Sequence, residues 1–132
     1  LKNNVLITTG IIDFDLIQNL KIKFFQKKND NIYLKNYSNT SVYFIYMPTF
    51  NDIESLLRNA KILITCHGAV THVANSFNVK IVDIIEENRK AFYQRYTSYL
   101  KKYNPVYRNK FNLLKKDIFN ICEAWLFCRQ IW

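Results

Sequence analysis

The sequence has few of the residues that cross-link or interrupt a chain: its 132 residues include three Cys, two Gly and two Pro. The Cys residues show no Cys-x-x-Cys spacing, which excludes a zinc ribbon. They are also too few for a disulfide framework, so we expect a reduced, cytoplasmic setting. The longest apolar runs, 42–48 and 61–66, are strand-sized and far short of a bilayer span, and a signal-peptide pattern is lacking. We therefore expect a soluble protein with one domain across residues 1–132.

Acidic residues are missing from one long stretch of a chain that is basic overall. The sequence carries 19 Lys and Arg against 10 Asp and Glu, a formal net charge of +9, and 49% of its residues are hydrophobic, which argues against intrinsic disorder. Residues 88–116 contain no acid and hold the whole excess of positive charge. Their basic residues are Arg89, Lys90, Arg95, Lys101, Lys102, Arg108, Lys110, Lys115 and Lys116. The charge is therefore a local feature of the C-terminal third.

Strand-like runs alternate with helical patterns over the first two thirds of the chain. Apolar, β-branched runs predict strands over 4–9, 32–34, 42–47, 61–66 and 79–85, with helices beginning near Asp13 or Asp15, near Asn51 or Asp52, and at Ala69. This alternation predicts a Rossmann-like α/β fold with an open, mostly parallel sheet and helices on both faces. The α/β core would span 1–86.

No further strand is expected after Ile85, and residues 87–132 are predicted to form C-terminal helices. The first would cover Glu87–Tyr103 and end at Asn104–Pro105, because proline disfavours a helical residue before it. On a helical wheel its aromatic residues fall on one side and its cations on the other. We expect the rings in the core and the cations in water.

Two other roles stay open for the basic stretch 88–116. A polybasic face attracts anionic lipid headgroups, so contact with a membrane surface is one alternative. A noncatalytic basic module that binds anionic lipid or nucleic acid through residues 88–116 is another, and an acidic protein is a further candidate partner. A base-stacking platform needs rings and cations turned toward the same ligand, so the predicted wheel argues against nucleic acid.

The segment 64–74 (ITCHGAVTHVA) is the best candidate for a ligand site. A buried strand ends at Cys66 and a helix begins at Ala69, and the free N–H groups at such a helix start can hold phosphate. Gly68 would let an anion approach the backbone, and His67 and His72 would offer imidazole donors or positive charge. The candidate phosphate ligands are Thr65, Gly68, Ala69, Val70 and Thr71, with Thr9 and Gly10 after the first strand. A tight strand-to-helix turn with packed histidines is the competing interpretation.

Two other chemistries at this segment are disfavoured. Cys66, His67 and His72 lack a fourth metal ligand of suitable spacing, so we expect no metal. A Cys66 nucleophile with His67 as its base is disfavoured because adjacent residues of an extended backbone point apart.

The run 51–85 (NDIESLLRNAKILITCHGAVTHVANSFNVKIVDII) resembles the donor-binding half of GT-B glycosyltransferases, and most of all the heptosyltransferase-type family, glycosyltransferase family 9. The matching positions are Ser55-Leu56-Leu57, Ala60-Lys61, the strand 62–65, the loop ending in His72, Ala74 and the strand 81–84. Aligned on His72, the residues His67-Gly68-Ala69 stand where the family has Asp-Thr/Ser-Gly, so His67 replaces an acidic residue.

This resemblance implies a transferase that uses an ADP- or UDP-sugar as substrate and no cofactor. His67 and His72 would then be catalytic, and Glu86, Glu87 and Arg89 would contact the donor, although the two acids also suit a helix cap. The acceptor would be a lipid-linked saccharide of lipopolysaccharide or surface polysaccharide, at the inner face of a bacterial membrane. The resemblance also implies an N-terminal partner domain that carries the acceptor machinery and precedes Leu1.

Overall fold

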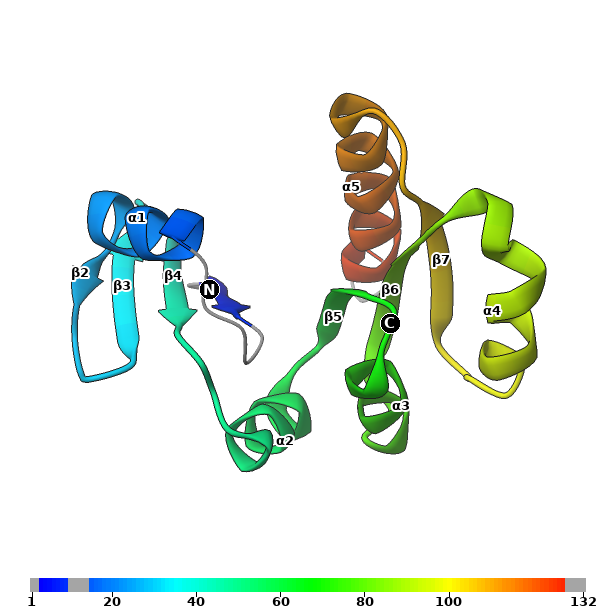
Figure 1. Ribbon diagram of the computed structural model, residues 1–132, viewed down its shortest axis with the longest axis horizontal. Coiled ribbons are helices and arrows are strands. Elements are labelled where there is room, and N and C mark those ends of the chain that lie inside the picture. The colour runs from blue at the N-terminus through cyan, green and yellow to red at the C-terminus, as the bar shows by residue number, and fades with distance from the viewer. Residues whose placement is uncertain (1–2, 10–14, 128–132) are drawn as a thin grey trace. The chain divides into compact units, whose positions relative to one another are not determined.

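The computed structural model describes residues 3–9 and 15–127 and shows an α/β protein (Figure 1). The chain divides into two compact units, Leu1–Ile53 and Glu54–Trp132, and each is described by itself. One domain across residues 1–132 stays a prediction. Among the described residues, no helix has both the length and the apolar character needed to cross a bilayer.

The first unit contains a mixed four-stranded sheet with the order β1-β4-β3-β2. The mostly parallel sheet predicted for this region is wrong here, because only β1 and β4 run parallel. The turn between β3 and β4 is closed by a hydrogen bond from the Tyr37 N–H to the Thr40 carbonyl at 2.8 Å, and so short a connection joins antiparallel strands only. The elements are β1 (Asn3–Thr8), α1 (Asp15–Phe24), β2 (Gln26–Lys27), β3 (Ile32–Asn36) and β4 (Thr40–Ile45).

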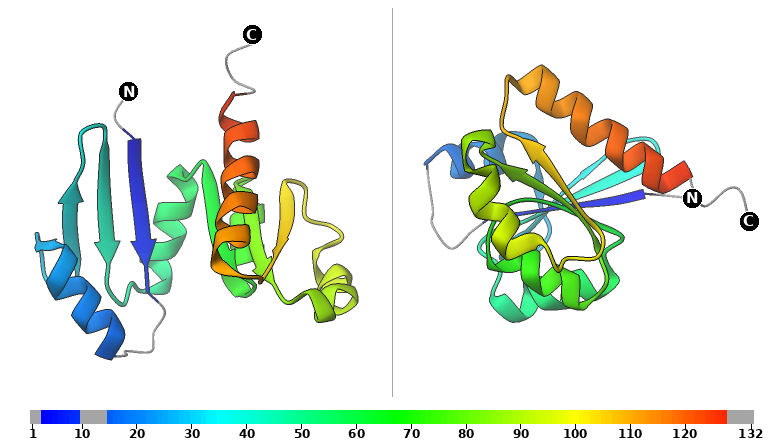
Figure 2. Two further views of the ribbon diagram at one scale, coloured as in Figure 1. Left: turned by 90° about the horizontal axis from the view of Figure 1, so that it is seen from above. Right: turned by 90° about the vertical axis from the view of Figure 1, so that its right-hand side faces the viewer.

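The second unit is a parallel sheet with the order β5-β6-β7, and it confirms the Rossmann-like α/β prediction. Figure 2 shows α3 and α5 on opposite faces of this sheet. The central strand β6 carries the core, since Ile81 and Val82 are completely buried. Helix α2 (Phe50–Asn59) crosses the boundary between the units. The other elements are β5 (Ile62–Cys66), α3 (Ala69–Ser76), β6 (Lys80–Ile85), the 3-10 turn η1 (Glu87–Arg89), α4 (Lys90–Thr97), β7 (Tyr103–Tyr107) and α5 (Phe111–Phe127).

Strand β7 corrects the prediction that no strand follows Ile85. The expected long helix Glu87–Tyr103 is divided into η1 and α4, and the chain then turns into β7, which pairs with β6. Pro105, taken as a helix breaker, lies inside β7 opposite Asp83. A proline has no N–H to donate to a neighbour, which an edge strand tolerates because it pairs on one side only.

The predicted burial of the aromatic side chains in this region is largely wrong. Phe92, Tyr96 and Tyr99 are 52%, 50% and 60% exposed, whereas Leu100 is buried and Tyr93 is half-buried. Helix α4 has only about two turns, and only a narrow part of its circumference faces the sheet. The rings outside that part stay in solvent.

Thr71, in the first turn of α3, is completely buried, and its hydroxyl has no hydrogen-bond partner within the described ranges 3–9 and 15–127. Replacing Thr71 with valine keeps the shape and removes a desolvated hydroxyl, so we expect the free energy of unfolding to rise by about 1 kcal/mol. Urea unfolding checks this. The matched control is Thr97→Val, which should lower the free energy of unfolding by about 1 kcal/mol. Its hydroxyl is also buried but donates to the Tyr93 carbonyl at 3.0 Å. Equal effects of the two substitutions would contradict this assignment.

Candidate functional site

Two histidines lie together at the start of α3, at the carboxyl end of β5. His67 precedes the N-cap residue Gly68, and His72 is the fourth residue of the helix. Side chains at these two positions commonly pack against each other and set the angle at which the chain enters a helix. Here the two imidazole rings are 5.6 Å apart between centroids and nearly perpendicular, at 86°. The local helix start therefore explains why the two rings meet.

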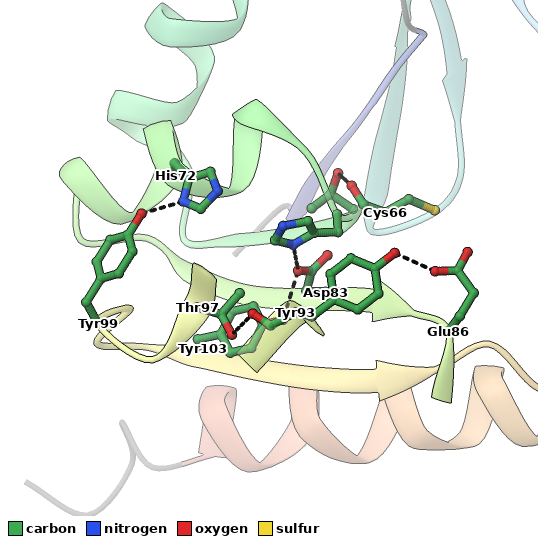
Figure 3. Close-up of polar contacts among 10 residues, drawn as sticks. Cys66, His72, Asp83, Glu86, Tyr93, Thr97, Tyr99 and Tyr103 are labelled. Carbon is green, nitrogen blue, oxygen red and sulfur yellow. Dashed lines mark hydrogen bonds and ion pairs between the residues drawn. The ribbon is translucent and has the colours of Figure 1, made fainter. Parts of the chain in front are cut away.

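His67 is held by a buried carboxylate of the neighbouring strand. Its Nδ1 atom lies 2.6 Å from Oδ2 of Asp83, which is completely buried in β6. The Tyr103 hydroxyl of β7 donates to the same Oδ2 at 2.9 Å, and Figure 3 draws both bonds. Burial and the Asp83 carboxylate raise the pKa of the Tyr103 phenol, so it remains a proton donor. The cluster thus joins one residue each from β6 and β7 to the loop that follows β5.

The Asp83 carboxylate determines which ring nitrogen of His67 is free for a ligand. A carboxylate only accepts hydrogen bonds, so Nδ1 of His67 carries the proton between them. That leaves Nε2 as the atom available for chemistry, with 15% of the side chain exposed and the Tyr93 ring 4.8 Å away between centroids. The same division of roles in acid–base enzymes orients an imidazole and stabilises its protonated form.

The His72 ring is held by Tyr99, which lies in the turn after α4. The Tyr99 hydroxyl and His72 Nδ1 are 2.6 Å apart, and their rings are nearly parallel, at 16°. In Figure 3 this pair and the Glu86–Tyr93 pair lie on either side of Asp83. Both imidazoles are therefore fixed by side chains outside α3.

The N-terminus of α3 has no side-chain cap, because its N-cap residue Gly68 has no side chain that could accept a hydrogen bond. The Thr71 N–H donates to the Gly68 carbonyl at 3.0 Å, while the N–H groups of Ala69 and Val70 belong to the first turn, where a helix offers no internal acceptor. The positive end of the helix dipole and two imidazoles meet at this point. An anion is the ligand that suits such a site.

A second polar group follows β6. The Tyr93 hydroxyl donates to Oε2 of Glu86 at 2.5 Å, and this bond is the main reason that the pKa of Glu86 is lowered and the pKa of Tyr93 is raised. Arg108 lies 3.6 Å from the other oxygen of Glu86 and 3.7 Å from Cys66 Sγ. Glu86, Glu87, Asn88 and Arg108 line a shallow depression here.

Removing the Tyr93 hydroxyl is expected to change stability only between two pH limits. The bond requires an ionised Glu86, so its contribution is lost as the pH falls through the lowered pKa of that carboxyl group. It also requires a protonated Tyr93, so the contribution is lost again as the pH rises through the raised pKa of the phenol. Tyr93→Phe should therefore be less stable than the parent at neutral pH and equally stable in strong acid.

Urea unfolding of both proteins across pH measures this difference. Tyr96→Phe, an exposed tyrosine on the same helix, is the control and should follow the parent at every pH. A constant deficit of Tyr93→Phe at all pH values would show that lost packing, and not the bond to Glu86, is responsible.

The predicted site residues do not all meet. His67, Gly68, Ala69, Val70 and His72 gather at the start of α3. Thr65 directs its hydroxyl to the Cys66 carbonyl, and Thr71 is buried beneath the loop, so its hydroxyl is not displayed to a ligand. Glu86 directly follows β6, and Glu87 and Arg89 belong to η1, at the same carboxyl edge of the sheet. Thr9 belongs to the first unit, where its hydroxyl accepts from the Met47 N–H at 2.8 Å, and Gly10 lies outside the described residues.

Residue-by-residue reasoning from the sequence missed Asp83, Tyr93, Tyr99, Tyr103 and Arg108. Asp83 did leave a signal, because it is a single acid among four apolar residues, Ile81, Val82, Ile84 and Ile85, and therefore needed a partner. The tyrosines and Arg108 left none, since their contribution depends on β7 and on the turn of α4.

The two disfavoured chemistries gain no geometric support. Cys66 is exposed and contacts Arg108, whereas His67 contacts Asp83, so the two side chains have separate partners. Within the part of the chain that the structure describes, no three His, Cys, Asp or Glu side chains are grouped to hold a metal ion.

Comparison of the chain with protein-family models, with characterised proteins and with solved structures finds no significant match. The second unit is a Rossmann-like parallel sheet with a pair of hydrogen-bonded histidines at the N-terminus of α3.

Proposed function

We propose that the second unit binds the diphosphate of a nucleotide sugar at the start of α3 and serves as the donor-binding half of a glycosyltransferase of the GT-B type. One observation carries the proposal: His67 and His72 converge on an uncapped helix N-terminus, and each is fixed by a hydrogen bond from outside the helix. The resemblance of residues 51–85 to the donor half of that class supports the same ligand.

The chemistry follows from where charge develops. In sugar transfer an acceptor hydroxyl oxygen bonds to the anomeric carbon as the bond from that carbon to the diphosphate oxygen breaks. The electron pair of the broken bond remains on the leaving diphosphate, and a base of the partner domain would take the hydroxyl proton. The N–H groups of Ala69 and Val70 and a protonated His67 would stabilise that charge, because donors fixed before the reaction need no reorganisation during it. Asp83 is a positioning residue that holds Nδ1 and turns Nε2 toward the ligand.

The acids after β6 divide between two roles in this proposal. Glu86 already accepts from Tyr93 and faces Arg108, so it shapes the depression at the sheet edge. Glu87 is exposed on the same depression and is the acceptor we assign to donor hydroxyl groups. Arg89 follows in η1 as a further cation. The lipid-linked saccharide acceptor, the N-terminal partner domain and the cytoplasmic face of a bacterial membrane belong to the same proposal.

Calorimetric titration of the full chain with ADP- and UDP-sugars, and with inorganic pyrophosphate, tests the site. We expect the His67→Gln/His72→Gln variant to bind about 10- to 100-fold more weakly than the parent to each ligand that the parent binds. The reason is that charge-assisted hydrogen bonds to phosphate are lost. Lys116→Gln on α5 removes one exposed positive charge away from α3 and should bind as the parent does.

Circular dichroism verifies that each variant is folded. Absence of binding by the parent to all of these ligands would overturn the proposal. Equal weakening by the histidine variant and by Lys116→Gln would show a general charge effect and would contradict the assigned site.

A further inference from the structure

We propose that the outer face of α4 and the turn after it dock on the surface of an anionic lipid bilayer. This α4 face consists of Phe92, Arg95, Tyr96, Lys101 and Lys102, all of them exposed. The inference is independent of donor binding, since none of these side chains belongs to the site at the start of α3.

The aromatic part of the α4 face is a pair of rings one helical turn apart. Phe92 and Tyr96 occupy positions i and i+4, and their ring centroids are 5.1 Å apart. They are 52% and 50% exposed, so about half of each side chain is open to solvent. Aromatic side chains of this kind are favoured at the level of lipid headgroups, where the ring meets apolar chains and a tyrosine hydroxyl stays in water.

One of the two cations of α4, Arg95, lies on the same side as these rings, whereas Lys90 lies on the opposite side and over the Tyr107 ring. At 100° per residue, Arg95 is only 60° from Phe92 and 100° from Tyr96 around α4. Lys101 and Lys102 follow in the exposed turn before β7, where the Lys102 ammonium group also donates to the Asn78 carbonyl at 3.4 Å. Residues 88–116 contain no acidic side chain that would neutralise these cations. The predicted burial of the rings, with only cations in water, is therefore wrong at Phe92 and Tyr96, which are exposed together with Arg95. The exposed arc of α4 combines rings with a cation, which is complementary to an anionic and partly apolar surface.

A lipid surface fits this face better than a nucleic acid. A site for single strands combines stacking rings with a groove that follows the phosphate backbone. The hollow beside α4 is lined by residues of its opposite side, including Tyr93, Gln94 and Thr97, together with β7. No residue of the α4 face lines that hollow. Rings and cations that project from the outside of a short helix suit a broad surface such as a bilayer, because such a surface does not need to be enclosed by a groove.

Co-sedimentation of the full chain with vesicles measures docking. We expect binding to phosphatidylcholine mixed with phosphatidylglycerol, little binding to phosphatidylcholine alone, and release by salt. Arg95→Gln/Lys101→Gln/Lys102→Gln should weaken binding about 100-fold, since each cation near the bilayer contributes about a factor of five. Phe92→Ser/Tyr96→Ser should also weaken it, most visibly at high salt, where apolar insertion is the remaining attraction.

The matched control is Lys110→Gln/Lys115→Gln/Lys116→Gln, which removes the same charge from α5 and the loop before it. It should weaken binding less than tenfold, and all variants should keep the circular dichroism spectrum of the parent. Equal losses in the two charge variants, or no binding to anionic vesicles, would overturn the proposal. So would tighter binding to a single-stranded oligonucleotide that the α4 variants abolish, because the face would then be a nucleic-acid site. Nucleotide-sugar binding measured without vesicles should be the same in parent and variants, so this test and the test of the donor site fail independently.

Discussion

Replacing Asp83 with alanine is expected to lower the free energy of unfolding by about 3 kcal/mol. Asp83 is completely buried in the central strand of the second unit and accepts from both His67 and Tyr103 at one oxygen. Alanine leaves both donors without their acceptor and opens a cavity. The loss is partly offset, because Oδ1 of Asp83 is buried without a hydrogen-bond partner among the described residues and costs stability in the parent.

A series of substitutions at Asp83 separates the loss of the hydrogen bonds from the loss of the charge. Asp83→Asn keeps one carbonyl acceptor and removes the charge, so it should lose about half as much as alanine. Urea unfolding followed by tyrosine and tryptophan fluorescence gives the values, and a double-mutant cycle with Tyr103→Phe isolates that one bond. Asp83→Ala with the stability of the parent would refute the cluster. A coupling free energy near zero between Asp83 and Tyr103 would show that the tyrosine does not belong to the cluster.

Asp83→Asn also tests positioning apart from stability. The amide can donate as well as accept, so it no longer selects the Nδ1-protonated form of His67. Nitrogen NMR of the imidazole should then show a changed tautomer ratio while the fold remains intact. An unchanged ratio would contradict the role assigned to Asp83.

Replacing Ile81 with alanine is expected to lower the free energy of unfolding by about 3 kcal/mol. Ile81 is completely buried in β6 and lies in register between Leu63 of β5 and Tyr103 of β7. The lost methyl and methylene groups leave a cavity that rigid neighbouring strands cannot fill. Denaturant unfolding measures the effect.

Ile64→Ala is the matched control for this prediction. The Ile64→Ala substitution removes the same atoms, but Ile64 belongs to β5 and is 49% exposed. The substitution should therefore lower the free energy of unfolding by about 1 kcal/mol or less. Similar losses at the two positions would mean that β6 is not the centre of the core.

Prediction from the sequence succeeded where local pattern decides the structure. The runs 61–66 and 79–85 became β5 and β6, and Ala69 became the first residue of α3. An unbroken apolar run suits a strand buried between others, and the glycine before Ala69 marks the start of a helix. The meeting of His67 and His72 also follows from chain neighbours, since their positions flank one helix start.

Prediction failed where long-range contact decides. Tyr103–Tyr107 contains a proline and an asparagine, which locally oppose a strand, yet the free edge of β6 supplies the partner that β7 needs. The helical wheel likewise orders residues around an axis but does not say how wide an arc the sheet covers. That width depends on the length of α4 and on the turn that ends it.

By itself, then, the sequence determined the α/β order, the helix start at Ala69 and the concentration of charge in residues 88–116, because these depend on residues close together along the chain. Only the tertiary structure decided that Asp83 holds His67 and accepts from Tyr103, and that Tyr99 holds His72. It also decided that Phe92, Arg95 and Tyr96 are all exposed on α4. The three hydrogen bonds join residues 16 to 27 positions apart. The pairing of β5, β6 and β7 brings the Asp83 partners together, and the turn after α4 brings Tyr99 to His72.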